Sequence, residues 1–452
     1  MNVIKNILVW ALTLESRLIV ARHKPYIIAV TGSVGKTSTK DAIYSVLSGP
    51  HVCDDQHICY VRRSEKSMNS ELGLPLTVIG APNAWHSASG WFRNLVTGAK
   101  LVLGGEYPDC LILEVGADHP GDIKRVAKWL EPDIAVITRV SRTPVHVEFF
   151  KSPEEVFEEK AALATAVKKG GALILFADDE RTLSLAERVK GRDVSVISYG
   201  LNEMAGIRGS EMQVLREGDV PAGFTFRVSS GGAGSVAPSD LSIFSELVTV
   251  RGVTGAAYMY PLLAAAAVGK ARGISAAAIA ASLSSFEAPH GRLNLLHGLN
   301  GSTLIDDTYN SSPDAATAAL EALKGIVPSA GGRRIAVLGD MMELGKYAAD
   351  EHRKIGREAI GTVDILYTAG QRSRLTADEA AKSGLPAESI RSFDTAEEAA
   401  EALAPIVAPG DVILVKGSQS MRMERVTRAL LADQSQAAEL LVRQEKEWLD
   451  KK

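Results

Sequence analysis

The stretch AVTGSVGKTSTK, residues 29–40, carries residue types and a spacing suited to binding phosphate. It follows the apolar run YIIAV and precedes STKDAIYSVLS, so the order is strand, glycine-rich turn and helix. The glycines let backbone N–H groups turn toward phosphate oxygens, and the helix N-terminus adds partial positive charge. Lys36 can reach the β- and γ-phosphates, and the Thr37 hydroxyl can ligate Mg²⁺. The predicted nucleotide contacts in this stretch are Gly32, Ser33, Val34, Gly35, Lys36, Thr37 and Ser38.

The spacing is a shortened form of the usual phosphate-loop pattern, which would place a glycine at Val30. The spacing predicts a nucleoside triphosphate site but does not indicate which reaction the protein catalyses. A GTPase is disfavoured because the base-reading Asn-Lys-x-Asp pattern is absent from the sequence.

Three further residues could serve the same site. Glu114 ends the strand-like run CLILE, where open α/β sheets bind ligands, and its carboxylate could hold Mg²⁺. The alternative is a surface glutamate at a turn. His146 and Lys160 follow the next strand-like run, DIAVIT, but spacing alone does not separate them from a structural histidine and a solvated lysine.

The composition limits the class of protein. A chain of 452 residues is too long for one hydrophobic core and predicts two or three domains. A net charge of −4 and an aromatic content of 6% argue against nucleic-acid binding. The three cysteines (Cys53, Cys59 and Cys110) have no metal-type spacing and predict a reduced, cytoplasmic protein.

The N-terminal residues 1–25 predict an amphipathic helix. Its apolar residues at helical spacing are Ile4, Ile7, Leu8, Ala11, Leu14 and Leu18. The apolar run is too short to span a bilayer, and no signal-peptide cleavage site follows. The helix either packs on the body of the protein or lies on a membrane surface, where the basic residues Lys5, Arg17, Arg22 and Lys24 would assist.

The rest of the chain alternates strand and helix patterns, which predicts α/β domains with mostly parallel sheets. We expect a phosphate-loop central domain over residues 26–287 and a Rossmann-like C-terminal domain over residues 288–452. Within them, residues 202–245 predict irregular hairpins or loops, and residues 434–452 predict a charged, solvated helix.

A series of motifs then points to one family. In order, the chain carries TGSVGKTSTK, SELGLPLT, EVGADHPGDI, VHVE…EEK, GRLN, DDTYNSSPDA, LGDMMELG…H and VKGSQSM. The series resembles the Mur ligases from about Ile28 to Val426, and is most similar to the members that add D-alanyl-D-alanine to a UDP-muramoyl tripeptide. The resemblance implies an ATP-dependent amide ligase of cell-wall (peptidoglycan) precursor synthesis, working through an acyl phosphate.

The resemblance also implies roles for individual residues. The implied catalytic residues are Lys36, His146, Lys160 and Arg292, with Lys160 carried as a carbamate. The implied magnesium ligands are Thr37, Glu114 and His146. Arg292, Asp306 and Asn310 would contact ATP from the C-terminal domain, where Asp307 shares the Asp306–Asn310 motif. Asn69 would contact substrate, and His352, Lys416 and Ser418 would face the nucleotide or the incoming amino-acid substrate. The partners would be ATP, Mg²⁺, D-Ala-D-Ala and a UDP-muramoyl peptide, and we expect a monomer.

The sequence departs from the family at the substrate-binding parts. No counterpart of the usual N-terminal UDP-binding domain precedes Gly32. Tyr258 and Pro261 stand where adenine-contacting asparagines are expected, and Phe176 replaces another asparagine. An amide ligase with a different carboxylate acceptor is therefore a second hypothesis, and a phosphate-loop ATPase that acts as a switch is a third.

Overall fold

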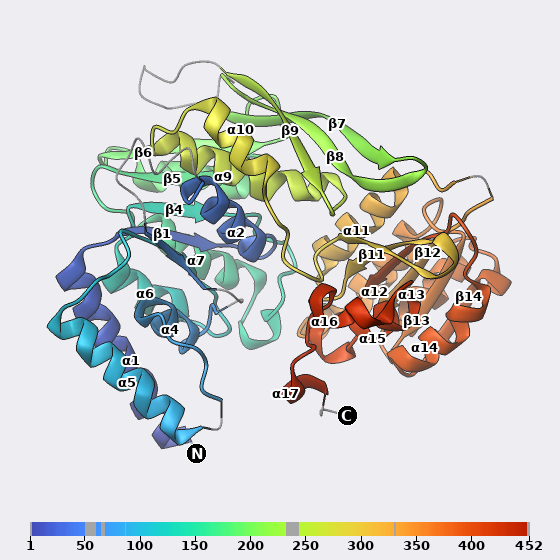
Figure 1. Ribbon diagram of the computed structural model, residues 1–452, viewed down its shortest axis with the longest axis horizontal. Coiled ribbons are helices and arrows are strands. Elements are labelled where there is room, and N and C mark those ends of the chain that lie inside the picture. Colours follow the sequence, from blue (N-terminus) through green and yellow to red (C-terminus); the bar gives the residue numbers. More distant parts are fainter. Residues whose placement is uncertain are drawn as a thin grey trace.

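The structure, a computed structural model, describes residues 2–49, 60–64, 68–85, 87–231, 244–329 and 331–449. Figure 1 shows two lobes, each built on one β-sheet with helices against it. The prediction of an α/β protein with parallel sheets is confirmed. Cys110 is buried with a free thiol, whereas Cys53 and Cys59 lie outside the described residues.

The first lobe contains a nine-stranded sheet in the order β2-β3-β1-β4-β5-β6-β7-β8-β9. Neighbours from β2 to β7 pair in parallel, and β7, β8 and β9 pair antiparallel. The strands are β1 (Tyr26–Thr31), β2 (Val61–Arg63), β3 (Cys110–Glu114), β4 (Ile134–Ile137), β5 (Gly171–Phe176), β6 (Val194–Gly200), β7 (Ile207–Glu217), β8 (Val220–Ser230) and β9 (Ser245–Arg251).

Helices cover both faces of this sheet. Successive residues of β1 enter different cores, Ile28 on one face and Ile27 on the other, as a strand buried on both sides requires. The helices are α1 (Asn2–His23), α2 (Lys36–Leu47), α4 (Gly73–Ile79), α5 (Ala88–Leu103), α6 (Asp122–Leu130), α7 (Pro153–Ala164), α8 (Glu180–Leu183), α9 (Met259–Ala271) and α10 (Ala276–Ser284). The carboxyl ends of β1, β3 and β4 therefore meet at one edge, where the phosphate loop begins.

The second lobe contains a six-stranded sheet in the order β10-β11-β15-β12-β13-β14, parallel except for β10. Its strands are β10 (Asn294–His297), β11 (Thr303–Asp307), β12 (Arg334–Gly339), β13 (Ile365–Ala369), β14 (Ile390–Phe393) and β15 (Val412–Lys416). Its helices are α11 (Pro313–Gly325), α12 (Ala348–Glu358), α13 (Arg374–Lys382), α14 (Ala396–Leu403), α15 (Glu424–Leu430), α16 (Ala437–Leu440) and α17 (Lys446–Leu449). The first lobe ends with α10 at Ser284 and the second sheet begins at Asn294, so the chain crosses between lobes within this interval.

Helix α1 packs on the body of the first lobe, beside α4 and α5 (Figure 1). Its buried residues are Leu12, Ser16 and Ile19, and the Ser16 hydroxyl donates to the carbonyl of Pro75 at 3.3 Å. Three residues of the predicted apolar stripe, Ile7, Leu14 and Leu18, are instead exposed. The helical spacing is satisfied by both faces, so spacing alone could not select the packed one. None of the helices within the described residues has the length and apolar character needed to cross a membrane.

A partly buried carboxyl group lies between α1 and α5. Oxygen Oε2 of Glu15 is buried against Gly98 and has no partner among the described residues. Burial raises the pKa of Glu15 to about 7. Because the folded protein holds this proton more tightly than the unfolded chain, the group lowers stability as pH rises from about 4.5 to about 7.

We therefore expect Glu15→Gln to stabilise the fold at pH 8 by about 1 kcal/mol, a value reduced for the partial exposure of the side chain. The measurement is urea unfolding of both proteins at pH 4.5 and pH 8. The gain should be smaller at pH 4.5, where the wild-type carboxyl is protonated. An equal gain at both pH values would show that ionisation of Glu15 is not its cause.

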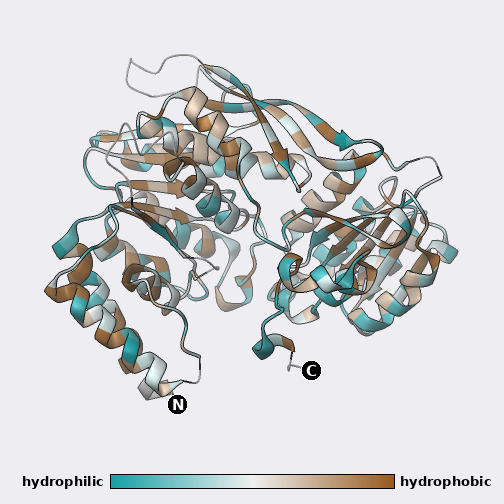
Figure 2. Ribbon diagram, in the orientation of Figure 1, coloured by the Kyte–Doolittle hydropathy of each residue, from teal (hydrophilic) through white to brown (hydrophobic). Residues whose placement is uncertain are grey.

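Of two sequence-based expectations about local structure, one is met and one is wrong. The region 202–245 contains an antiparallel hairpin of two 11-residue strands, β7 and β8, whose register shifts at two places, so the irregular hairpin is confirmed. The hairpin is not merely a surface loop, because Phe224, Phe226 and Val228 are buried. Residues 232–243 of this region lie outside the described residues. The tail is not one solvated helix: it contains the short α16 and α17, and Arg443 between them is only 7% exposed. Figure 2 shows apolar and polar residues mixed along the strands of the β7–β8 hairpin, as expected for strands with alternating burial.

Candidate functional site

The phosphate loop connects β1 to α2 and rests on the end of β4. Gly32 has a φ of +145°, and a Cβ there would lie 1.9 Å from the Thr138 hydroxyl oxygen, so only glycine fits. The N–H groups of Ser33 and Val34 donate to the carbonyl of Arg139 at 2.8 and 3.3 Å. Gly35, with a φ of +84°, leads directly into α2. The sequence thus folds into the strand, turn and helix that the motif predicted.

Lys36 and Thr37 stand at the first turn of α2. The Lys36 ammonium donates to the carbonyl of Ser33 at 3.4 Å, and burial lowers its pKa. The Thr37 hydroxyl donates to Oε2 of Glu114 at 3.0 Å. The loop therefore brings a cation and a hydroxyl to the start of α2, where the N–H groups of a helix's first turn can donate to a phosphate.

Glu114 lies at the end of β3, next to β1 in the sheet. Its second carboxylate oxygen accepts a hydrogen bond from Nδ2 of Asn69 at 3.0 Å. A hydroxyl and a carboxylate held side by side are hard oxygen donors of the kind Mg²⁺ prefers, and Mg²⁺ at phosphate sites needs only one or two protein ligands. Thr37 and Glu114 thus fit a magnesium ion, although their role as ligands stays a prediction.

His146 lies apart from that pair in the hydrogen-bond network. Its Nδ1 is 2.8 Å from Oε2 of Glu343 in the second lobe, and its Nε2 is 3.6 Å from Oδ1 of Asp118. Hydrogen bonding to His146 lowers the pKa of Glu343. Both His146 and Glu343 have left-handed backbone conformations, with φ of +67° and +63°. Within the described ranges, no group of three or more His, Cys, Asp or Glu side chains gathers as a metal site.

Lys160 is buried in α7, whose N-terminus is capped by Ser152 and begins with Pro153. Burial, with repulsion from Lys36, lowers the pKa of Lys160 to about 7. Its neighbour Glu159 accepts hydrogen bonds from the N–H groups of Gly121 and Lys124, each at 3.0 Å, which fixes α7 against α6. The site therefore contains a lysine whose amine loses its proton near neutral pH.

Arg292 connects the two lobes at the phosphate loop. It lies just before β10, and its Nη2 donates to the Thr37 hydroxyl oxygen at 3.1 Å. Its guanidinium stacks 4.3 Å from the centroid of the Tyr309 ring. A second connection joins Arg139, beside the loop, to Asp314 of α11 at 3.2 Å. The second lobe thus reaches the triphosphate site directly.

Buried hydrogen bonds and an ion pair fix the segment Asp306–Asn310 in the second lobe. Asp306 accepts hydrogen bonds from Thr308 and Thr427 at 2.8 and 2.9 Å, and burial raises its pKa to about 7. Lys416 donates to the Asp307 carboxylate at 2.6 Å and to the carbonyl of Asn310 at 3.0 Å.

The other predicted substrate residues also make internal contacts. The Ser418 hydroxyl oxygen accepts from the N–H of Met342 at 2.8 Å. His352 is 1% exposed, with Nε2 accepting from the N–H of Met341 and Nδ1 donating to the carbonyl of Ala348. Burial lowers the pKa of His352, so the ring is a neutral support of the loop before α12. Any contact of these residues with substrate stays a prediction.

Sequence reasoning missed Arg443 in the tail. Its guanidinium donates to the carbonyls of Thr308 and Tyr309 and pairs with the buried Glu424 at 2.9 Å. It thereby positions the ring on which Arg292 stacks. A lone arginine in a charged tail gave no signal of this role, because its partners lie far away in the sequence.

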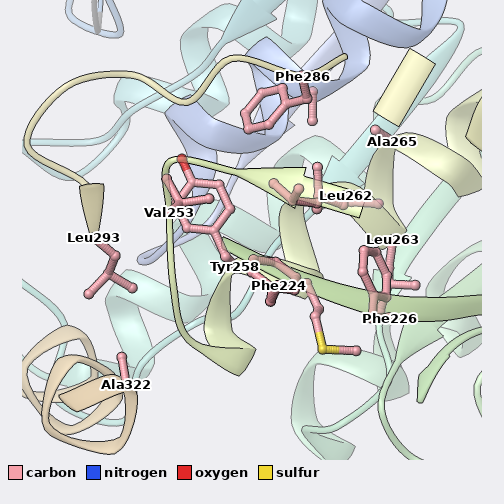
Figure 3. Close-up of a cluster of buried hydrophobic side chains, with 14 of the residues drawn as sticks. Phe224, Phe226, Val253, Tyr258, Leu262, Leu263, Ala265, Phe286, Leu293 and Ala322 are labelled. Carbon is pink, nitrogen blue, oxygen red and sulfur yellow. The ribbon is translucent and has the colours of Figure 1, made fainter. Parts of the chain in front are cut away.

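A small cavity of about 50 Å³ lies beside the phosphate loop. It is lined by Val34, Gly35, Thr39, Thr138, Arg139, Phe176, Tyr199, Ala257, Tyr260, Pro261, Asp314 and Ala318. Tyr258 is not among them: it packs beside Phe286 and Val253 in the hydrophobic cluster of Figure 3. The tyrosine that lines the cavity is Tyr260. Its hydroxyl donates to Asp178 at 2.9 Å.

The fold and the site together define a nucleoside triphosphate-dependent enzyme with a phosphate loop in one lobe and an arginine supplied by the other. Comparison with known proteins gives the class. Residues 92–236 match the Mur ligase middle domain, and residues 291–419 match the Mur ligase glutamate ligase domain. The chain belongs to the Mur ligase family, and within it to the MurF ligases, which are ATP-dependent.

Curated relatives support this placement. The chain is 33% identical over 427 residues to the UDP-N-acetylmuramoyl-tripeptide–D-alanyl-D-alanine ligase of Mycobacterium tuberculosis (strain CDC 1551), covering 90% of this chain and 73% of that protein. It is 26% identical over 409 residues to the ligase of the same name from Bacillus subtilis (strain 168), covering 90% and 76%.

Solved structures agree in fold. MurF ligase from Thermotoga maritima in complex with ADP superposes with a TM-score of 0.71 at 25% identity, covering 93% of this chain and 83% of that one. MurF from Acinetobacter baumannii also gives a TM-score of 0.71, at 23% identity, covering 92% and 79%. The predicted family is therefore confirmed.

Proposed function

We propose that this chain joins D-alanyl-D-alanine to a UDP-muramoyl tripeptide, at the cost of ATP, in cell-wall precursor synthesis. The observation that carries the proposal is the hydrogen bond from Arg292 of the second lobe to Thr37 of the phosphate loop. A two-lobed arrangement of this kind can exclude water from a reactive acyl phosphate, which a simple ATPase has no need to do.

In the proposed reaction the terminal carboxylate of the peptide attacks the γ-phosphorus of ATP, giving an acyl phosphate and ADP. The amine of D-Ala-D-Ala then attacks the acyl carbon, and phosphate leaves as the amide forms. Lys36 and the N–H groups at the start of α2 would hold the phosphates, and Arg292 would neutralise charge from the second lobe. Mg²⁺ held by Thr37 and Glu114 would supply charge neutralisation at the phosphate oxygens.

Lys160 has a separate proposed role as a carbamate. Its neutral amine would add to CO₂, releasing a proton and becoming an anion in a buried position near Lys36. The low pKa and the burial of the side chain support this assignment. His146 would orient Asp118 and connect the lobes through Glu343, and the implied contact of His146 with the metal stays a prediction.

Adenine is proposed to bind in the small cavity beside the loop, against Tyr260. Residues of both lobes line this cavity, so a change in the distance between the lobes would change its width. We expect Tyr260→Ala to raise the KM for ATP about tenfold, since an aromatic stack on a base is worth about 1–3 kcal/mol. Tyr260→Phe, which keeps the ring and loses only the hydroxyl, is the matched control and should stay near wild type. Steady-state kinetics that find both variants at the wild-type KM would refute this site.

The reaction is tested by incubating the protein with ATP, Mg²⁺, UDP-muramoyl tripeptide and D-Ala-D-Ala, followed by mass spectrometry. The expected product is the UDP-muramoyl pentapeptide, with one phosphate released for each amide formed. Amide formation only with another acid would favour the second hypothesis, a ligase with a different acceptor. Phosphate release without any amide product would favour the ATPase.

Three properties of the whole protein also stay predictions: a cytoplasmic location, a monomeric state and a peripheral membrane contact through α1. The exposed apolar residues Ile7, Leu14 and Leu18 of α1 are the reason for considering membrane contact. Sedimentation with anionic vesicles tests it, and a protein that stays in the supernatant at low salt would rule it out.

A further inference from the structure

A groove of about 520 Å³ runs from the candidate site to helix α1. One wall is α1, through Lys5, Val9, Trp10, Thr13, Leu14 and Arg17. The others are the segment 69–75 and helix α6, through Asp122, Arg125, Val126 and Trp129. The volume suits a ligand of the size of a nucleotide or sugar phosphate.

The inner end of the groove belongs to the candidate site. Asn69, Gly116 and Asp118 line the groove. Asn69 donates to Glu114, which in turn accepts from Thr37, and Asp118 faces His146. A substrate whose carboxylate reaches the phosphate loop therefore has a continuous path along the groove toward α1.

The α1 wall carries positive charge that no described side chain neutralises. Lys5 and Arg17 make no hydrogen bond or ion pair through their side chains with any described residue. The carboxylates of the opposite wall are already engaged, because Glu71 and Asp122 both contact Arg125. Asp122 also accepts from the N–H groups of Asp118 and His119. The groove thus presents to an incoming anion two cations, Lys5 and Arg17, that have no partner in the part of the chain that the structure describes.

The same wall presents an aromatic surface. Trp10 is 66% exposed while it lines the groove, and Trp129 lies partly buried on the α6 side. An exposed indole beside these two cations is suited to a ligand with a planar or sugar ring next to a phosphate, since the ring can stack while the phosphate is paired.

We propose that this groove binds the non-reacting end of the acceptor, a phosphate or diphosphate ester of a ring compound. Arg17 and Lys5 pair with the phosphate, and Trp10 stacks on the ring. The inference rests on the proposed function, because it takes the substrate carboxylate to lie at the phosphate loop.

The kinetic test uses Arg17→Glu, with Arg22→Ala as the matched control, an exposed cation on the same helix that does not line the groove. We expect Arg17→Glu to raise the KM for UDP-muramoyl tripeptide about tenfold or more, since a charged hydrogen bond to phosphate is lost. The KM values for ATP and D-Ala-D-Ala should stay near wild type, as should every constant of Arg22→Ala. With a muramoyl tripeptide that lacks the uridine diphosphate, wild type and Arg17→Glu should become alike.

A binding test separates the groove from the reaction. With the ATP site filled by saturating ADP and Mg²⁺, titration of UDP should quench tryptophan fluorescence in the wild type. Trp10→Phe should lose most of this quenching, and Arg17→Glu should weaken the binding about tenfold. Circular dichroism of each variant verifies that it is folded.

The outcomes distinguish the two proposals. If UDP binds as described but no amide forms with the muramoyl pair, the proposed reaction fails and the groove assignment stands. If amide forms while UDP quenching and the acceptor KM are unaffected by both variants, the groove assignment is refuted and the reaction stands. Binding of anionic vesicles that Arg17→Glu abolishes, with no response to UDP, would equally refute the groove as a substrate site.

Discussion

Replacing Lys160 by alanine is expected to lower ligase turnover by about 100- to 1,000-fold, the usual cost of losing one charged group at a transition state. Lys160 is 5% exposed, and burial together with Lys36 lowers the pKa of its amine to about 7. In the proposed mechanism it carries a carbamate, so the variant loses that anion. Phosphate release coupled to amide formation measures the effect.

The matched control is Lys151→Ala, which removes an exposed lysine just before the same helix and should leave turnover unchanged. Added acetate or propionate should restore part of the activity of Lys160→Ala by placing a carboxylate where the carbamate stood. Wild-type turnover in Lys160→Ala would refute the role of this residue.

The pKa of about 7 gives this role a pH and CO₂ dependence. The neutral amine that reacts with CO₂ increases as pH rises through 7, so carbamate formation should be favoured above that pH. ¹³C NMR of the protein equilibrated with ¹³C-bicarbonate should show a carbamate signal at pH 8 that is absent from Lys160→Ala. The same signal in the variant would assign it to another amine.

Lys416→Met is expected to destabilise the protein by about 3–5 kcal/mol, the usual cost of removing one partner from a buried ion pair. The Lys416 ammonium is 2% exposed and is the cation that contacts the Asp307 carboxylate at 2.6 Å. The substitution would remove the cation that pairs with the Asp307 carboxylate. It would also remove the hydrogen bond from Lys416 to the carbonyl of Asn310. Urea unfolding measures the loss.

The double variant Asp307→Asn/Lys416→Met serves as the control, because it removes both charges together. It should recover a large part of the stability lost in Lys416→Met, and the two single effects should not add. If the double variant is as unstable as the sum of the singles, the pair is not coupled and the account of this segment is wrong.

The features that could be predicted from the sequence are those that depend on residues close together in the chain. The phosphate loop, the alternation of strand and helix, and the position of Glu114 at a strand end all follow from short-range patterns, and each appears in the structure. The motif resemblance added Lys160 and Arg292, which the fold places near Lys36 and Thr37.

The parts that the sequence did not reveal depend on contacts between distant residues. Arg443 acts on Tyr309 and Glu424, and nothing in the surrounding tail indicates those partners. The face of α1 that packs was mistaken because two stripes satisfy the same helical period. His352 is buried and supports the loop before α12, because both of its ring nitrogens form hydrogen bonds with backbone groups, those of Met341 and Ala348.

The most direct test of the central claim, that ATP activates a carboxylate, follows oxygen from the acceptor into phosphate. The acceptor tripeptide is labelled with ¹⁸O in its terminal carboxylate and turned over with ATP and D-Ala-D-Ala. The account predicts one ¹⁸O atom in each phosphate released, because the carboxylate oxygen leaves with the phosphoryl group. Phosphate that carries no ¹⁸O, or takes its oxygen from labelled water, would contradict an acyl phosphate and with it the proposed ligase mechanism.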